Sequence, residues 1–94
     1  MSSHLTPLEV CEFLIGPLPQ LGLIAGRNDK AAYAWRRGSE WRAPGDMPPS
    51  VNRALLAHAE KHGIPLKARD LIFGADRAKV AARLATVRTP EAAE

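Results

Sequence analysis

The sequence predicts a small all-α domain of five to six helices. Apolar residues recur at intervals of three and four along most of the chain, which is the spacing of one helix face. Prolines and glycines stand where these periodic segments begin and end, and almost no segment favours a strand. A chain of 94 residues has room for one domain, which we expect over residues 1–88, with a flexible tail over residues 89–94.

A short first helix is predicted to begin at Pro7 and to run through about Ile15. Thr6 and Glu9 have the spacing of a capping box, in which each side chain bonds to the backbone of the other residue. Pro7 occupies the first helical position, where a missing N–H costs nothing. A glycine and two prolines close behind Ile15 end the helix.

Two further helices are predicted over about residues 19–25 and from the next turn through about residue 37. Gly26 suits the left-handed backbone of a tight bend between them because it has no Cβ. Asn28 or Asp29 can then cap the second of these helices with a side-chain oxygen. The first of them is too short to be stable without tertiary support.

The next segment is predicted to be a loop followed by a long helix. Gly38 closes the preceding helix, and residues 39–46 have the glycine, proline and polar side chains of an exposed loop. The long helix begins in Pro48-Pro49-Ser50 and runs to His62, with Gly63 as its C-terminal cap. Its apolar stripe consists of Val51, Ala54 or Leu55, Leu56 and Ala59.

Two more helices complete the expected fold. One lies near residues 68–73, after an extended segment in which Pro65 disfavours helix at the preceding residue. The last begins at an Asp76 cap and spans about residues 76–88. Its narrow apolar stripe, at positions i, i+4 and i+7, covers either the core or a second subunit. The residues of this stripe are Val80, Leu84 and Val87.

Residues 19–37 have the layout of a DNA-reading helix-turn-helix. The crossing of the two helices needs a small residue in the first helix, which is Gly22, and the bend needs a glycine, which is Gly26. Ala32 and Trp35 lie three positions apart on one face and are expected to hold the second helix against the core. In such a motif the N-terminal part of the second helix enters the major groove.

Positive charge is densest in this part of the chain. The formal net charge is +3, yet residues 1–26 contain no lysine or arginine, whereas residues 27–42 hold five basic side chains against two acidic ones. Clustered basic side chains attract phosphate and release counterions, which favours nucleic-acid binding. A solvated helix face is the competing interpretation of the charge alone.

The predicted DNA contacts form two groups. The residues placed to meet base edges are Asn28, Asp29, Lys30, Tyr33 and Ala34. The residues placed near phosphates are Arg27, Arg36, Arg37 and Arg42. Lys30 can donate to guanine, Asn28 can donate to adenine or phosphate, and Asp29 can accept from cytosine. For Tyr33, packing of its helix is an equal alternative.

The chain resembles the small Cro/repressor-like helix-turn-helix proteins of the YdaS and carph-isopro kind, which occur in bacterial chromosomes and prophages. The resemblance spans about residues 17–73. It rests on the glycine turn and on the order of four blocks, which are Ala31-Ala32-Tyr33-Ala34-Trp35-Arg36-Arg37-Gly38, Met47-Pro48, Leu55-Leu56-Ala57-His58-Ala59-Glu60-Lys61-His62-Gly63-Ile64-Pro65-Leu66 and Asp70-Leu71-Ile72. It implies a lambda-repressor/Cro-like domain that binds double-stranded DNA at a promoter or operator and regulates transcription, often as a dimer.

Other chemistry has less support in the sequence. We expect no catalysis, cofactor or metal, because His58 and His62 match neither of the zinc-protease patterns and are expected on a solvated helix face. Cys11 lies among apolar neighbours, so we expect a small core residue rather than a nucleophile. No apolar run approaches the ~20 residues of a membrane span and no secretion signal is evident, so a bacterial cytoplasmic location is expected.

The main alternative function is a protein-interaction module, or a subunit of a hetero-oligomeric regulator that docks on another transcription factor or on RNA polymerase. Trp41 bears on this alternative because it lies in the expected loop between basic residues. Its ring is expected either to tuck onto the core or to contact DNA or a partner protein. The expected assembly is a homodimer or a hetero-oligomer with another regulator.

Overall fold

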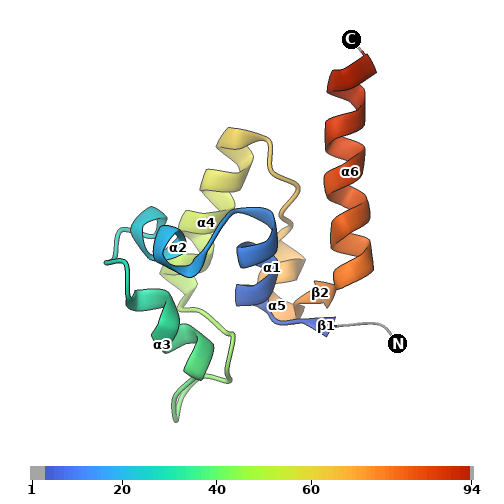
Figure 1. Cartoon of the computed structure of the whole chain (residues 1–94). Coiled ribbons are helices and arrows are strands. Elements are labelled where there is room, and N and C mark those ends of the chain that lie inside the picture. The colour runs from blue at the N-terminus through green and yellow to red at the C-terminus, as the bar shows by residue number, and fades with distance from the viewer. Residues whose placement is uncertain (1–3, 94) are drawn as a thin grey trace.

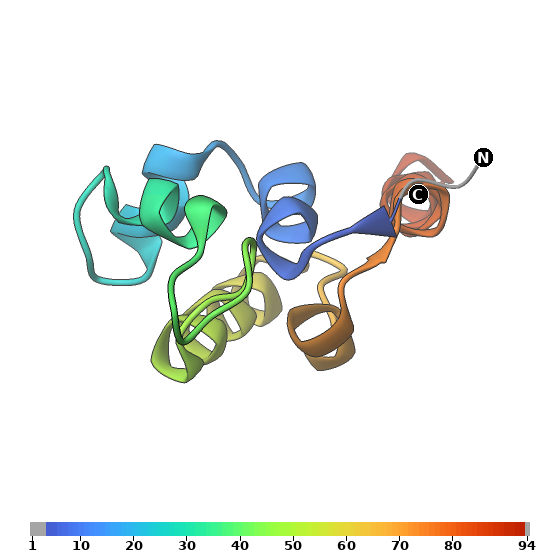
Figure 2. The same ribbon diagram turned by 90° about the horizontal axis from the view of Figure 1, so that it is seen from below.

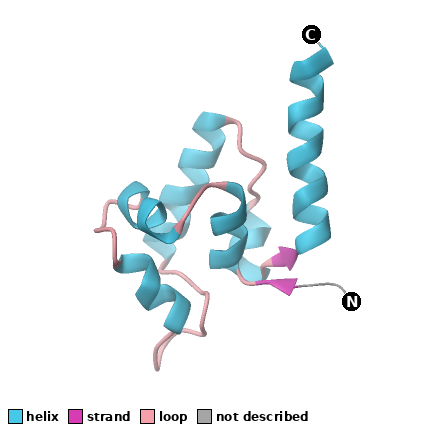
Figure 3. Ribbon diagram, viewed as in Figure 1, coloured by secondary structure: helices cyan, strands magenta, loops and turns pink. Residues whose placement is uncertain are grey.

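Six helices and a short two-stranded sheet make up the part of the chain that the structure, a computed structural model, describes (Figures 1 and 3). This part comprises residues 4–93, with the side chains of residues 4–86. The elements in chain order are β1 (His4–Leu5), α1 (Pro7–Leu14), α2 (Leu18–Ile24), α3 (Ala31–Arg37), α4 (Pro49–His62), α5 (Ala68–Phe73), β2 (Ala75–Asp76) and α6 (Arg77–Ala93). The prediction of a mostly helical fold is therefore confirmed, and no described helix is long and apolar enough to cross a membrane.

Helix α1 lies at the centre of the molecule and contacts α2 and α3 on one side and α5 and α6 on the other (Figures 1 and 2). Its start is fixed by the predicted capping box. Thr6 Oγ1 accepts a hydrogen bond from the Glu9 N–H at 3.3 Å, and Glu9 Oε1 accepts one from the Thr6 N–H at 2.9 Å. Because five of its eight residues are buried, α1 presents apolar surface to helices on both sides.

One hydrophobic core runs through the helices around α1. Its buried members are Leu8, Val10, Cys11 and Leu14 of α1, Leu18 and Leu21 of α2, Ala32 and Trp35 of α3, Val51, Leu55 and Ala59 of α4, Leu71 of α5 and Val80 of α6, together with Leu5, Met47 and Leu66. Cys11 is a core residue, as predicted. Burial raises the pKa of its thiol to about 12, and the Asp70 carboxylate adds to that rise, so the thiolate is not populated near neutral pH.

The two-stranded sheet was not expected from the sequence. Strand β1 pairs antiparallel with β2, with His4 opposite Asp76 and Leu5 opposite Ala75, and the pair joins the start of the chain to the start of α6 (Figure 2). Gly74 makes this approach possible because its φ is +72° and a Cβ there would overlap the Leu5 carbonyl oxygen. Strands of two residues are too short to show an alternating pattern, so the sequence gives no signal for them.

Helix α6 begins at the predicted Asp76 cap, where Asp76 Oδ2 accepts hydrogen bonds from the N–H groups of residues 78 and 79. Val80 is fully buried in the core of its own chain and Leu84 packs partly against it, so for Val80 the stripe covers the core rather than a second subunit. The side chain of Val87 lies outside the described residues. The backbone helix continues to Ala93, past the predicted end near residue 88.

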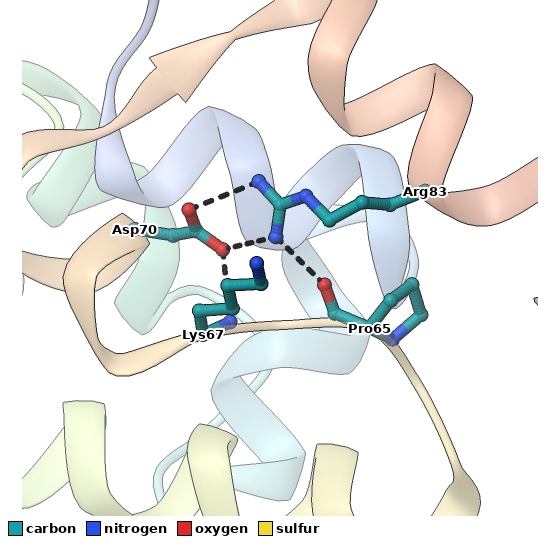
Figure 4. A network of polar contacts seen from close by, with 4 residues as sticks. All are labelled: Pro65, Lys67, Asp70 and Arg83. Atoms are coloured by element: carbon teal, nitrogen blue, oxygen red, sulfur yellow. Dashed lines mark hydrogen bonds and ion pairs between the residues drawn. The ribbon is translucent and has the colours of Figure 1, made fainter.

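A buried ion pair fastens α6 to α5 (Figure 4). Asp70 is only 3% exposed, and Arg83 donates to both of its carboxylate oxygens, at 2.8 and 3.1 Å. Asp70 Oδ2 also accepts from the Lys67 N–H at 2.8 Å, and Arg83 donates to the Pro65 carbonyl oxygen at 2.9 Å. The carboxylate is thus supplied with three donors, which is the condition for a buried charge to be tolerated.

Replacing Arg83 tests this clamp. Arg83→Met leaves the Asp70 carboxylate buried without a cation, so we expect a loss of about 3 kcal/mol in the free energy of unfolding and a melting temperature lower by more than about 10 °C, measured by circular dichroism. Lys79→Met, at an exposed position of the same helix, is the control and should melt close to the parent. The double variant with Asp70→Asn should recover part of the loss, because no buried charge remains. Equal melting of Arg83→Met and Lys79→Met contradicts the expected role of the pair.

Candidate nucleic-acid interface

Helices α2 and α3 pack against each other and are joined by residues 25–30. Gly26 has the predicted left-handed backbone, with φ of +77°, and the Arg27 N–H donates to the Gly22 carbonyl oxygen at 2.9 Å. Gly22 is buried, and a Cβ at this position would overlap the carbonyl oxygen of Asn28. A residue without a side chain is therefore needed in α2 where the turn folds back against it. The Ala31 Cβ of α3 would lie 3.7 Å from a Cβ at Gly22, which is ordinary van der Waals contact.

The start of α3 differs from the prediction. The helix begins at Ala31 with Lys30 as its N-cap residue, and no side chain caps it. Asn28 Oδ1 instead accepts from the Lys30 N–H at 2.9 Å, which closes a local turn before the helix. Short amide side chains favour such turns over helix caps when the backbone N–H two residues on is within reach. Asn28 and Asp29 therefore lie in the turn, and α3 itself is seven residues long.

Helix α3 has one buried face and one exposed basic face. Ala32 and Trp35 are buried, with Trp35 4% exposed, which confirms them as the residues that hold α3 in the core. The residues opposite them, at positions i, i+3, i+4 and i+7, are Lys30, Tyr33, Ala34 and Arg37. Lys30 and Arg37 are exposed, whereas Tyr33 and Ala34 are half-buried. Tyr33 packs partly against the core, so only the remaining part of its side chain is exposed on this face.

The four arginines predicted to contact phosphate have different surroundings. Arg27 donates to Ser50 Oγ at 3.2 Å, which places its guanidinium beside the first turn of α4. Arg36 lies with its guanidinium 5.2 Å from the centre of the Tyr33 ring. It also borders a hollow of about 210 Å³ that is lined by two carboxylates of α1, Glu9 and Glu12. These carboxylates reduce the positive potential around Arg36.

Arg37 and Arg42 lie at the C-terminal end of α3 and in the loop after it. Arg37 is exposed, on the side of the helix that also presents Lys30. Arg42 is half-buried, and its Nε is a buried donor without a hydrogen-bond partner in the described part of the protein. Among the four arginines, Arg37 therefore presents its charge most directly on the exposed face of α3.

The loop after α3 carries Trp41 at its tip. The Ser39 N–H donates to the Arg42 carbonyl oxygen at 2.9 Å, and the Arg42 N–H donates back to Ser39 at 3.4 Å, so residues 40 and 41 form the tip of a tight turn. Trp41 is 89% exposed. Of the two alternatives expected for its ring, packing onto the core is wrong, because the turn leaves the ring in solvent.

The histidine pair of α4 lies apart from this surface. The rings of His58 and His62 lie close together, with their centres 4.3 Å apart and their planes tilted by 40°. Desolvation lowers the pKa of His58 from its usual value, and the positive charges of His62 and Lys61 act in the same direction. Among the described residues, no group of three or more histidine, cysteine, aspartate or glutamate side chains has a geometry that would hold a metal ion.

Substituting Gly22 tests the packing of the turn. In Gly22→Ala the new methyl group overlaps the Asn28 carbonyl, so we expect a loss of about 1–3 kcal/mol in the free energy of unfolding despite the better helix propensity of alanine. Chemical denaturation measures this change in the free energy of unfolding. Gly16→Ala is the matched control, because a Cβ there meets only the flexible side chain of Gln20. A Gly22→Ala variant as stable as the parent would show that the turn is not tightly packed on α2.

No protein-family model matches this chain, and no curated protein or solved structure matches it either.

Proposed function

We propose that this protein is a transcriptional regulator of the Cro/repressor helix-turn-helix type that binds double-stranded DNA through α3. The observation that carries the proposal is the exposed basic face of α3, with Lys30 and Arg37, lying opposite the buried Ala32 and Trp35. A helix held from below by its apolar face can present the other face to a groove without moving relative to the core. Helix α2 packs against α3, and Gly22 leaves the space that the turn between the two helices occupies.

The proposed base-contacting surface consists of the turn before α3 and the first half of α3. Lys30, at the N-cap of α3, donates to guanine acceptors in the major groove, and Ala34 lies one helical turn further with a small apolar surface for a thymine methyl group. Asp29, exposed in the turn, accepts from a cytosine amino group. The side-chain Oδ1 of Asn28 already accepts from the Lys30 N–H, so the side-chain NH₂ group is the part that donates to adenine or phosphate.

Phosphate contacts supply the sequence-independent part of the proposed affinity. Arg37 is the principal candidate, because it is exposed on the reading face of α3. Arg36 contributes less, because Glu9 and Glu12 border the same hollow and repel a DNA strand that approaches from that side. Arg27 and Ser50, joined by a hydrogen bond, offer a further donor at the start of α4.

Binding of the full chain to DNA is tested by electrophoretic mobility shift, with duplexes selected by the parent protein from a pool of randomised sequences. We expect the parent to enrich a sequence. In Lys30→Ala the preference for that sequence over a random duplex should fall by about 1–3 kcal/mol, because one base contact is lost. In Arg37→Ala all duplexes should bind more weakly, and the slope of log affinity against log salt should fall by about one.

Two matched controls separate these effects from a general loss of positive charge. Arg69→Ala removes the same charge from α5, at the opposite side of α1 from α3, and should bind as the parent does. Arg36→Ala removes a neighbouring arginine of α3 and should weaken binding less than Arg37→Ala. The proposal fails if the parent binds no duplex at low salt, or if Arg69→Ala and Arg37→Ala weaken binding equally.

A further inference from the structure

We propose that the turn formed by residues 39–42 is a second DNA contact, in which the ring of Trp41 stacks on a base or sugar next to the stretch that α3 reads. This inference rests on the proposed function and adds to it a specific residue outside the helix pair. Three observations carry it. They are the exposure of the ring, the fixed geometry of the turn and the charge on either side of it.

The exposure of Trp41 has no explanation within its own chain. At 89% it is the most exposed of the large hydrophobic side chains in the described part of the chain, ahead of Ile72 at 67% and Phe73 at 62%. A tryptophan left in water costs apolar hydration, and tryptophan at binding surfaces commonly dominates the affinity. The side chains that the structure describes leave this ring almost entirely uncovered.

The loop that contains the turn is tied at both ends to the elements that hold α3. The Gly45 N–H donates to the Trp35 carbonyl oxygen at 2.8 Å, and the Gly45 carbonyl oxygen accepts from the Leu8 N–H at 2.9 Å. At the other end of the loop, Gly38 has φ of +81°, and a Cβ there would meet the backbone of Arg42 and Pro44. Because its shape is already fixed, the turn loses little conformational entropy when Trp41 is covered.

The charges beside the turn fit a nucleic acid. Arg37 precedes the turn on the exposed face of α3, and the half-buried Arg42 closes the turn. Glu40 shares the tip with Trp41 and is exposed, so it must face away from the phosphates when the ring makes contact. A DNA duplex offers phosphates for Arg37 and, at the edge of a groove, sugars and base steps against which an aromatic ring can pack or insert.

The test compares Trp41→Ala and Trp41→Phe with the parent in mobility-shift titrations on the same selected duplex and on a random duplex. We expect Trp41→Ala to bind about tenfold more weakly and Trp41→Phe to retain most of the affinity, because phenylalanine keeps an aromatic face. Phe73→Ala is the matched control, since it removes a large exposed ring from α5 and should bind as the parent does. All three substitutions are at exposed positions, so melting temperatures close to that of the parent are expected.

Tryptophan fluorescence gives a second, independent measurement. Trp35 is buried and already shielded, so acrylamide quenching of the free parent reports chiefly Trp41. Adding the duplex should reduce that quenching in the parent and leave it unchanged in Trp41→Phe, whose remaining tryptophan is Trp35. A blue shift of the parent emission on binding has the same meaning.

The outcomes distinguish this inference from the proposed function. If the parent binds DNA and Trp41→Ala binds equally well, the turn is not a DNA contact while the proposed function stands. The same conclusion follows if Trp41 stays quenchable in the complex, or if Trp41→Ala disturbs only the binding of a protein partner. If the parent binds no duplex at all, the proposed function fails and this inference fails with it.

Discussion

The need to bury helix α1 on nearly all sides constrains the rest of this structure. Leu8, Val10, Cys11 and Leu14 are buried within an eight-residue helix, which is too short to be stable alone. It must therefore be enclosed, with α2 and α3 on one side and α5 and α6 on the other. A chain of 94 residues has few other ways to build a continuous core, so this central helix determines where every other element lies.

The enclosure of α1 leaves two groups of helices on opposite sides of it. At one end, α3 and the loop after it present basic side chains and an exposed ring, supported by the buried Ala32 and Trp35. At the other end, α5 and α6 are fastened by the Asp70–Arg83 pair and by the short sheet. The strongest polar network thus lies away from the proposed DNA-binding face, so substitutions on α3 change binding without weakening this clamp.

The hydrogen bonds of Gly45 join α1, α3 and the loop into one body. Gly45 donates to Trp35 at the end of α3 and accepts from Leu8 in the first turn of α1. A helix of seven residues and a loop of irregular backbone would otherwise move independently of each other. Because both are tied to the same central helix, the backbones of α3 and the loop are held together, as the proposed contact with a groove and its edge requires.

The sequence alone determined the features that depend on residues within about one helical turn of each other. These include the Thr6–Glu9 capping box, the left-handed Gly26, the start of α6 at Asp76 and the burial of Ala32 and Trp35. Only the tertiary structure decided the pairing of residues 4–5 with residues 75–76, the partner of Asp70 and the exposure of Trp41. The physical reason is distance along the chain. Caps and periodicity are set by local backbone geometry, whereas these three features depend on segments brought together by burial of α1 or on the direction in which one turn projects from the core.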